Sequence, residues 1–307
     1  MKTLHVILGL VGCVCFTPLA FGGFVEHFPT NGFDNNWTFV DMYGNGPSTT
    51  FGLSKIVSNL PGEDPDHCAF RAYDANPGAF NPFVGSYGPG FIAGFAGDVM
   101  TDGRITGWVN CNPTQQGNDQ GLMLRVNPST LQAYTLNFDE FQGCAVLGVY
   151  DPNLPAAPGN PFHFWNLVDH IGLSSFTDTP VFLDLQITGN TLTGSAYQAE
   201  GESLVLRGSA SFTAGVDTPG LQWGSYQPSA AEVPVLTSGY SGIFANVNSN
   251  YNLNGTNTDG HPCLLENVLT NGPLPIDMAW DEITVIPEPA TLVFLGLSSM
   301  WLVRWRK

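Results

Sequence analysis

Apolar and polar residues alternate in short runs along most of the chain, and no window between the two ends shows sustained helical periodicity. The runs are rich in β-branched and aromatic residues and are bounded by Gly, Asn and Pro, a pattern typical of strands and turns. The sequence therefore predicts an all-β protein. The clearest predicted strands are Trp37 to Met42, Gly90 to Ala96, Arg104 to Cys111, Gly121 to Val126, Leu131 to Phe138, Cys144 to Val149, Val181 to Thr188, Thr191 to Tyr197, Glu202 to Thr213, Gly239 to Val247 and Met278 to Ile286.

Two groups of strands show how they connect. In VFLDLQITGNTLTGSAY, Leu183, Leu185 and Ile187 alternate with polar residues, and Gly189-Asn190 fits a two-residue hairpin turn. This predicts a hairpin with one apolar and one polar face. The run GRITGWVNCNPTQQGNDQGLMLRVNPSTLQAYTLNF holds three successive strands and predicts a meander.

Three longer stretches are heavy in Pro, Gly or Asp and are predicted to be irregular: Asn59 to Pro89, Asp151 to Asp169 and Ala214 to Ser238. Loops of this length usually carry function or are disordered. No linker clearly divides the chain, so we expect one β-sandwich domain over residues 23–286.

Both ends of the chain have the character of targeting segments. Residues 1–22 combine Lys2, an apolar region and a small-residue site at Ala20-Phe21-Gly22, which predicts a signal peptide and export. Cleavage at Cys13, within Leu10-Val11-Gly12-Cys13, is the alternative. At the other end, the apolar run from Ala290 to Val303 would reach only about 21 Å as a helix, short of a bilayer core.

The tail combines Pro287-Glu288-Pro289, a short apolar helix, and Arg304, Arg306 and Lys307 as a basic end. These parts, in this order, closely resemble the PEP-CTERM sorting signal of diderm bacteria. The resemblance implies that residues 287–307 are recognised by an exosortase in the inner membrane, with transient anchoring and release or attachment at the cell surface or extracellular matrix. An ordinary C-terminal membrane anchor without processing is the alternative, and in both cases the basic residues would stay in the cytoplasm.

Charge and cysteine content limit the classes of partner, metal ion and disulfide that the chain can be expected to have. With the two end segments set aside, five basic residues remain against 25 acidic ones, which argues against nucleic acid or anionic lipid as a partner. No cofactor is predicted, although calcium is a candidate, for instance at the Asn-rich run from Asn246 to Gly260. Four cysteines remain, and export favours two disulfides among Cys68, Cys111, Cys144 and Cys263, with three connectivities open. A zinc site formed by Cys68, Cys263 and their neighbours His67 and His261 is the alternative.

A second resemblance concerns the body of the chain. The order GLMLRVNPSTLQAYTLNF, VFLDLQITGNTLTGSAY, GYSGIFAN and MAWDEITVI looks like the second half of a laminin-G or concanavalin-A-like jelly roll, over about residues 105–285. It implies a jelly-roll β-sandwich with long loop insertions. It also implies that Asp281 is a hydrogen-bond acceptor in a turn or at a closing strand, with no catalytic role.

The sequence shows no clear pattern of paired catalytic carboxylates or histidines. A retaining glycosidase needs two carboxylates about 5 Å apart, yet the pairs Asp139-Glu140 and Asp281-Glu282 are adjacent residues that point to opposite faces of a strand. Glu200 and Glu202 share a face but flank Gly201 at a predicted turn. His163 and His170 would lie on one side of a short helix as a metal pair, with surface histidines as the alternative.

Aromatic residues are the remaining candidates for binding, since exposed rings stack on the faces of sugars. We expect core packing to claim most of them, including Trp37, Trp108 and Trp280 in strands. Trp165, Trp223 and Tyr226 are the predicted glycan-contact residues. The leading hypothesis is an exported, non-enzymatic surface or matrix protein that binds polysaccharide. The alternatives are a glycan-acting hydrolase with loop carboxylates and a purely structural surface protein.

Overall fold

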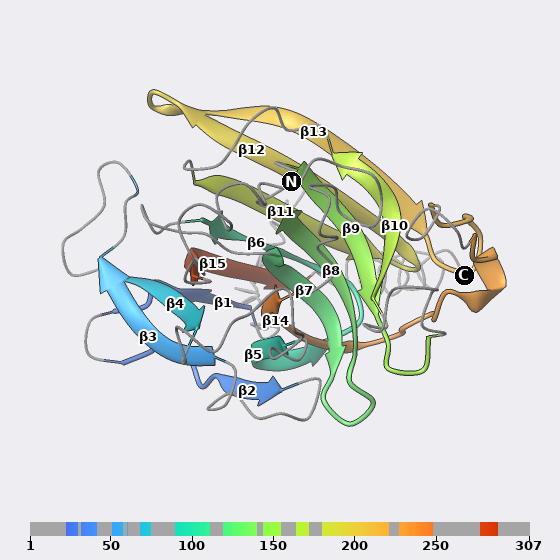
Figure 1. Ribbon diagram of the computed structural model, residues 1–307, viewed down its shortest axis with the longest axis horizontal. Helices are drawn as coiled ribbons and strands as arrows, with labels where there is room; N and C mark the ends of the chain where they lie inside the picture. The colour runs from blue at the N-terminus through green and yellow to red at the C-terminus, as the bar shows by residue number, and fades with distance from the viewer. Residues whose placement is uncertain are drawn as a thin grey trace, which may run out of the picture.

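The computed structural model describes residues 23–29, 32–41, 51–57, 60, 68–74, 90–110, 119–139, 144–154, 164–171, 180–220, 227–247 and 277–287. Within these ranges the chain forms fifteen strands and one short 3-10 helix, η1 (Ala230–Glu232). The strands make two antiparallel sheets, and in Figure 1 β11 to β13 of one sheet lie over β7 to β10 of the other. None of the helices in this described part is long and apolar enough to cross a membrane.

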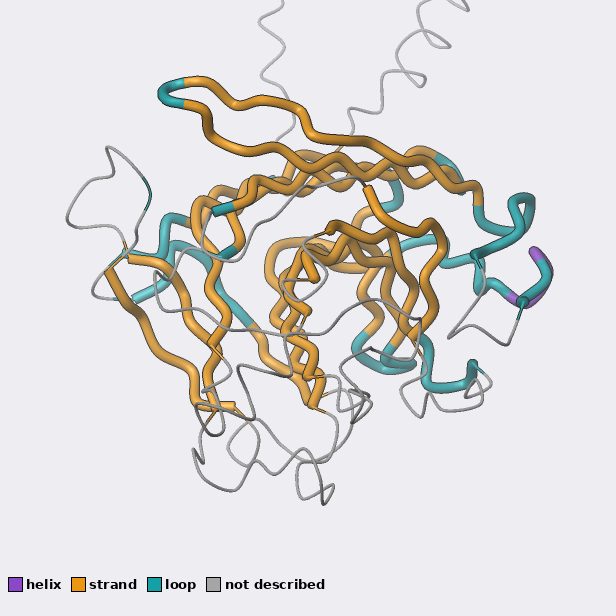
Figure 2. The backbone as a smooth tube through the Cα atoms, turned by 45° about the horizontal axis from the view of Figure 1, so that its top comes forward, coloured by secondary structure: helices purple, strands orange, loops and turns teal. Residues whose placement is uncertain are grey.

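The eight-stranded sheet has the order β13-β12-β11-β6-β15-β4-β3, with β1 also paired to β15. Its strands are β1 (Phe24–Glu26), β3 (Phe51–Val57), β4 (Cys68–Asp74), β6 (Gly103–Val109), β11 (Val181–Thr188), β12 (Thr191–Glu200), β13 (Ser203–Thr213) and β15 (Asp277–Pro287). The long β12–β13 hairpin extends past its neighbours and is visible in both Figure 1 and Figure 2.

The seven-stranded sheet has the order β10-β9-β8-β7-β14-β5-β2. Its strands are β2 (Thr38–Asp41), β5 (Gly90–Met100), β7 (Asp119–Asn127), β8 (Gln132–Asp139), β9 (Cys144–Tyr150), β10 (Phe164–Ile171) and β14 (Gly239–Val247). Strands β7 to β10 follow one another in the chain and in the sheet, so they form a meander.

The predicted all-β jelly-roll sandwich is confirmed, and each of the eleven predicted strands is present. The hairpin turn is also confirmed, since Thr188 pairs with Thr191 and Gly189 adopts a φ of 58°. A left-handed conformation of this kind is available to glycine at little cost, which is why the turn begins there.

Three expectations are wrong. The predicted meander of three strands breaks after its first, because β6 belongs to the eight-stranded sheet and β7 and β8 to the other. Two of the predicted irregular stretches contain strands, β4 and β10. The helix considered around His170 is therefore replaced by strand β10, whose pairing with β9 decides its conformation. His163 lies outside the described residues.

The core fills the space between the two sheets. Along β11, Leu183, Leu185 and Ile187 are fully buried while the residues between them are half-buried, so one face points inward. Leu136 and Leu147 from β8 and β9 meet them in a single apolar cluster. Burial of each such side chain contributes about 1.5 to 3 kcal/mol, and along β11 the alternation leaves the residues of the other face partly exposed.

One end of the sandwich is tied by the buried side chain of Arg125, which is 2% exposed. Its guanidinium donates to the carbonyl oxygens of Thr101 (2.8 Å), Gly189 (2.6 Å) and Leu236, and to the Asp102 carboxylate at 3.2 Å. Burial lowers the pKa of this guanidinium from its ordinary value. The contacts link the β5–β6 and β11–β12 turns to the segment before β14, so Arg125 has a structural role.

Candidate functional site

Of the three predicted glycan-contact residues, only Trp165 lies in the described part of the chain, and the prediction for it is wrong. Trp165 is 0% exposed and belongs to the core cluster between the sheets. It lies in β10, where it pairs with Val149 of β9, and the alternation of that strand turns its ring inward together with Leu167. Trp223 and Tyr226 lie outside the described residues.

A row of aromatic side chains crosses the outer face of the eight-stranded sheet. Trp108 of β6 lies opposite Phe182 of β11, and Phe182 lies opposite Tyr197 of β12. The ring centroids are 5.4 Å apart for the first pair and 6.1 Å for the second, and both pairs are edge to face at 71° and 68°. All three side chains are half-buried, and Leu206 of β13, 53% exposed, lies opposite Tyr197. We refer to Trp108, Phe182 and Tyr197 as the aromatic row.

The face beside the aromatic row is polar. One pleat away, Asp184 lies opposite both Thr106 of β6 and Ser195 of β12. We refer to Thr106, Asp184 and Ser195 as the polar row. Further along the same face, Thr193 lies opposite Ser211, and the hydroxyls of Thr191 and Thr213 are 3.1 Å apart. The outer face thus combines flat apolar rings with many hydroxyl groups.

One ion pair stands at the centre of the polar row. Arg104 donates from Nε and from a terminal nitrogen to the two oxygens of Asp184, each at 2.7 Å. These hydrogen bonds raise the pKa of the Arg104 guanidinium above its ordinary value, so it remains cationic. The Asp184 side chain is 13% exposed and that of Arg104 is 43% exposed. Each charge is therefore neutralised by the other where it meets the face.

The outer face of the seven-stranded sheet has a different character. Its side chains form a second apolar cluster that includes Met123, Phe164 and Phe244, all at most 4% exposed. Thr135 and Asn137 of β8 lie on this face, and within the described part of the chain the buried Thr135 hydroxyl and Asn137 carbonyl oxygen have no hydrogen-bond partner. These described side chains are therefore closed to solvent, unlike the half-buried rings of the aromatic row.

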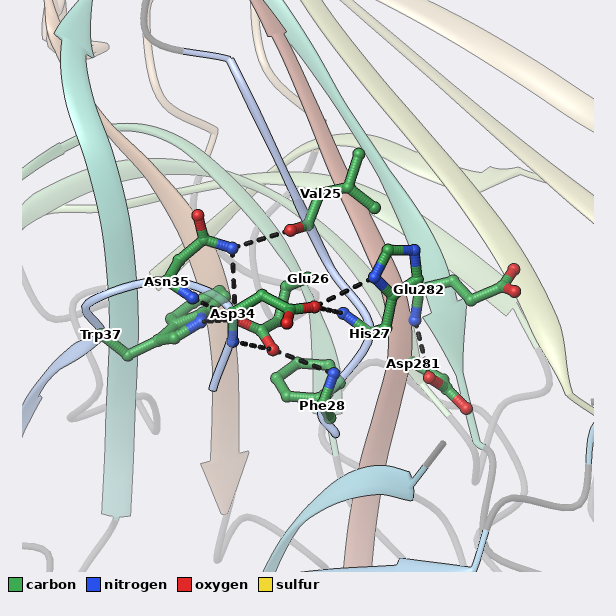
Figure 3. A network of polar contacts seen from close by, with 9 residues as sticks. All are labelled: Val25, Glu26, His27, Phe28, Asp34, Asn35, Trp37, Asp281 and Glu282. Atoms are coloured by element: carbon green, nitrogen blue, oxygen red, sulfur yellow. Dashed lines mark hydrogen bonds and ion pairs between the residues drawn. The ribbon is translucent and has the colours of Figure 1, made fainter. Parts of the chain in front are cut away.

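The most heavily bonded carboxylate in the described part of the chain is Glu26 (Figure 3). It is 0% exposed and lies at the end of β1. Its Oε1 accepts from the backbone N–H of Phe28 (2.9 Å) and of Asp34 (3.0 Å). Its Oε2 accepts from the backbone (3.0 Å) and side-chain (3.2 Å) nitrogens of Asn35, and from Nε1 of Trp37 (2.8 Å).

This arrangement fixes the connection from β1 to β2. Phe28 has a φ of 51°, a strained conformation for an aromatic residue, and its N–H is held by Glu26. Around it, His27 donates its backbone N–H to Asp34 at 3.0 Å, and Asn35 donates to the carbonyl oxygen of Val25 at 2.8 Å (Figure 3). Five donors already occupy the Glu26 carboxylate, so we interpret the network as structural.

Of the two adjacent carboxylate pairs, Asp281-Glu282 has described side chains, whereas those of Asp139 and Glu140 lie outside the described part. Asp281 is 0% exposed and accepts the backbone N–H of Glu282 at 2.8 Å, whereas Glu282 is exposed and has a φ of 48°. The expected acceptor role of Asp281 is confirmed by this bond. Glu200 and Glu202 are exposed at the tip of the β12–β13 hairpin, where Gly201 has a φ of 64°.

The two described candidate cysteines, Cys68 and Cys144, lie in different sheets, in β4 and β9. No disulfide joins them. The described part of the chain therefore contains no disulfide, and the predicted pair of disulfides is not supported within it. Cys111 and Cys263 lie outside the described residues.

The described residues also contain no group of three or more His, Cys, Asp or Glu side chains that could hold a metal ion. His67, His163, His261 and the run from residue 248 to residue 260 fall outside these ranges, so the calcium and zinc hypotheses concern other parts of the chain. Arg304, Arg306, Lys307, Glu288 and Pro289 also lie outside them, while Pro287 ends β15 opposite Gly103.

No protein-family model matches the chain, and no curated protein matches it in sequence. Among solved structures, the chain is similar to the β-glucanase of Bacillus licheniformis, with 11% identity over 87% of this chain and 98% of that one and a TM-score of 0.42. Arcelin-5, a lectin-like defense protein from Phaseolus vulgaris, has 7% identity over 87% and 98% and a TM-score of 0.40. The carbohydrate-binding module CBM66 from Bacillus subtilis has 10% identity over 82% and 92% and a TM-score of 0.38. Similarity at this level transfers no function to this chain.

Sequence reasoning missed the aromatic row, although a signal for it was present. In VFLDLQIT, Phe182 shares its parity with Asp184 and Gln186, the polar positions, and not with Leu183 and Leu185. An aromatic residue on the polar parity of a half-buried strand points outward. Trp108 has the same outward parity relative to Val109, and the expected packing role holds in part because its ring packs against the buried Ala69 and Ala279.

Proposed function

We propose that this chain is an exported, non-enzymatic surface or matrix protein that binds polysaccharide through the outer face of its eight-stranded sheet. The proposal includes sorting by an exosortase at the inner membrane, on the strength of the Pro287-Glu288-Pro289 tail and its basic end.

The aromatic row is the observation that supports polysaccharide binding. Aromatic pairs opposite one another stabilise a sheet, so the row also contributes to the fold. Trp108 also packs against the buried Ala69 and Ala279. Its ring and those of Phe182 and Tyr197 nevertheless stay partly exposed, unlike the fully buried Trp165 and Trp280. The half-exposed Trp108, Phe182 and Tyr197 lie in line across three strands and next to hydroxyl groups, an arrangement suited to the apolar faces and hydroxyls of sugars.

The carboxylates near the aromatic row favour binding over hydrolysis. Glycoside hydrolysis generally requires two carboxyl groups, one on each side of the scissile bond. Beside the row, Asp184 is bound to Arg104 through both oxygens, and Asp281, opposite Trp108, is fully buried. Neither is available to a sugar on the row as a general acid or as a nucleophile.

The binding part is tested by incubating the purified protein with soluble polysaccharides and measuring retention and new reducing ends in the same samples. We expect retention without new reducing ends, and weaker retention for Trp108→Ala. Val99→Ala is the matched control, because Val99 is exposed (56%) in β5, away from the row. New reducing ends would establish a hydrolase in place of a binding protein, and the absence of both signals would leave a purely structural role.

The sorting part is tested in a host that contains an exosortase. We expect the mature protein to lack its C-terminal segment, which intact mass measurement detects. Glu288→Ala should leave the uncleaved protein in the inner membrane. A mature protein that keeps residues 290–307 in both variants would contradict exosortase processing and favour an ordinary membrane anchor.

A further inference from the structure

We infer that the outer face of the eight-stranded sheet binds an uncharged, extended polysaccharide chain, with the chain axis along the aromatic row and therefore across β6, β11 and β12. This inference rests on the proposed function and adds the chemical class and the orientation of the ligand.

The orientation follows from the strand register. Trp108, Phe182 and Tyr197 occupy directly opposed positions on neighbouring strands, so the row is perpendicular to the strands. Neighbouring strands are about 4.8 Å apart, which puts the outer two rings about 10 Å from each other. Both outer rings are steeply inclined to Phe182, at 71° and 68°. A straight chain of sugars would therefore contact Trp108 and Tyr197 with alternate units and pass over Phe182 between them.

Asp184 and Ser195 of the polar row give a chain in this orientation its hydrogen-bonding partners, whereas Thr106 is only 7% exposed. Thr106, Asp184 and Ser195 run parallel to the aromatic row, displaced by two residues along each strand, or about 7 Å. Hydroxyl groups on one edge of a chain that lies on the rings would point toward these side chains. Each oxygen of Asp184 accepts one hydrogen bond from Arg104 and keeps a lone pair for a sugar hydroxyl.

Charge selects for a neutral ligand. The chain carries a formal net charge of −17 at pH 7, so an anionic polysaccharide is repelled. Beside the row, the charge of Arg104 is compensated by Asp184 at 2.7 Å, and Arg207 of β13 forms an ion pair with Glu200. At these two ion pairs the described face offers no net positive charge to a carboxylate on the ligand, and its other groups beside the row are neutral hydrogen-bonding side chains such as Ser195.

The test uses two soluble probes with the same extended β-linked backbone. Hydroxyethyl cellulose is neutral, and carboxymethyl cellulose is anionic. Pullulan, neutral but coiled and α-linked, tests the requirement for an extended chain. Affinity gel electrophoresis of the full protein with each probe, at low and at high salt, gives the relative affinities. At low salt, we expect the protein to bind hydroxyethyl cellulose about tenfold more tightly than either of the other two probes. At high salt, the difference in affinity between hydroxyethyl cellulose and carboxymethyl cellulose should become smaller, because salt screens the repulsion.

Two sets of variants connect these affinities to the face. Trp108→Ala and Tyr197→Ala should each weaken binding of hydroxyethyl cellulose by about tenfold, and Val99→Ala should leave it unchanged. Asp184→Asn removes the negative partner of Arg104 and should increase the affinity for carboxymethyl cellulose relative to the neutral probe. Arg104→Gln should decrease it. A role of this ion pair in sheet stability alone would not move the two ratios in opposite directions.

The outcomes separate the inference from the proposed function. If no probe and no polysaccharide from the producing cell is retained, the proposed function itself fails. If the protein is retained but binds the anionic or the coiled probe at least as tightly, or if Trp108→Ala and Tyr197→Ala bind like the unmodified protein, then polysaccharide binding stands and the inferred ligand and orientation are wrong. The opposite shifts for Asp184→Asn and Arg104→Gln, together with the preference for the neutral extended probe, would support it.

Discussion

Replacing Glu26 by glutamine tests whether the buried carboxylate holds the connection between β1 and β2. Five hydrogen bonds converge on it, three on Oε2 and two on Oε1. A glutamine side chain of the same length keeps one acceptor oxygen and places an NH₂ group at the other position. We expect the amide to orient with its oxygen toward Asn35 and Trp37, because three donors meet there.

In that orientation the other two donors lose their acceptor, which lowers the free energy of unfolding. The backbone N–H groups of Phe28 and Asp34 would face another donor and lose their acceptor. A buried donor left without an acceptor costs about 1 to 3 kcal/mol, so two of them cost about 2 to 6 kcal/mol. Removing a buried negative charge lowers the desolvation penalty and offsets part of this destabilisation. We therefore expect a loss of about 2 to 4 kcal/mol in the free energy of unfolding.

Denaturant unfolding of Glu26→Gln followed by tryptophan fluorescence measures this loss. A shift of the urea midpoint by about 1 M at unchanged slope corresponds to it. Glu202→Gln is the control, since Glu202 lies in the exposed β12–β13 turn and its substitution should change stability by less than about 0.5 kcal/mol. A midpoint for Glu26→Gln equal to that of the control would refute the structural interpretation of the network.

Three further substitutions test the fold. Gly121→Ala should destabilise the protein by more than about 2 kcal/mol in the same unfolding assay, because its Cβ would lie 2.0 Å from the backbone oxygen of Leu136 and neither strand can move away. Arg125→Met should destabilise the protein by about 3 kcal/mol or more, since three carbonyl groups lose their donor, and a change below about 1 kcal/mol would contradict the structural role of Arg125. Burial raises the pKa of the Tyr134 hydroxyl, which donates to a carbonyl oxygen at 2.7 Å. As pH rises, this hydroxyl therefore ionises at a lower pH in the unfolded chain than in the folded protein. The free energy of unfolding should fall above about pH 10, and it should fall less steeply in Tyr134→Phe than in the unmodified protein.

Local pattern was enough to determine much of the architecture. The alternation in Val181 to Thr188 specifies which side chains face the core, and Gly189 specifies the turn, because side-chain period and turn geometry depend on a few neighbouring residues. The all-β class and the eleven predicted strands follow from the same kind of information. The strands that were missed, such as β4 and β10, lie in stretches rich in turn-forming residues, where pairing with another strand overrides the local preference.

The candidate site depended on information of another kind. The sequence indicated that aromatic residues were the candidates for ligand contact, but it favoured Trp165, whose ring is buried once β10 pairs with β9. It also could not assign β6 and β7 to different sheets. Parity shows that Phe182 points outward, yet only the register of β6 on β11 and of β11 on β12 aligns it with Trp108 and Tyr197. A strand's own residues determine its two faces, whereas the neighbours of each face are decided by contacts between strands far apart in the chain, which only the tertiary structure supplies.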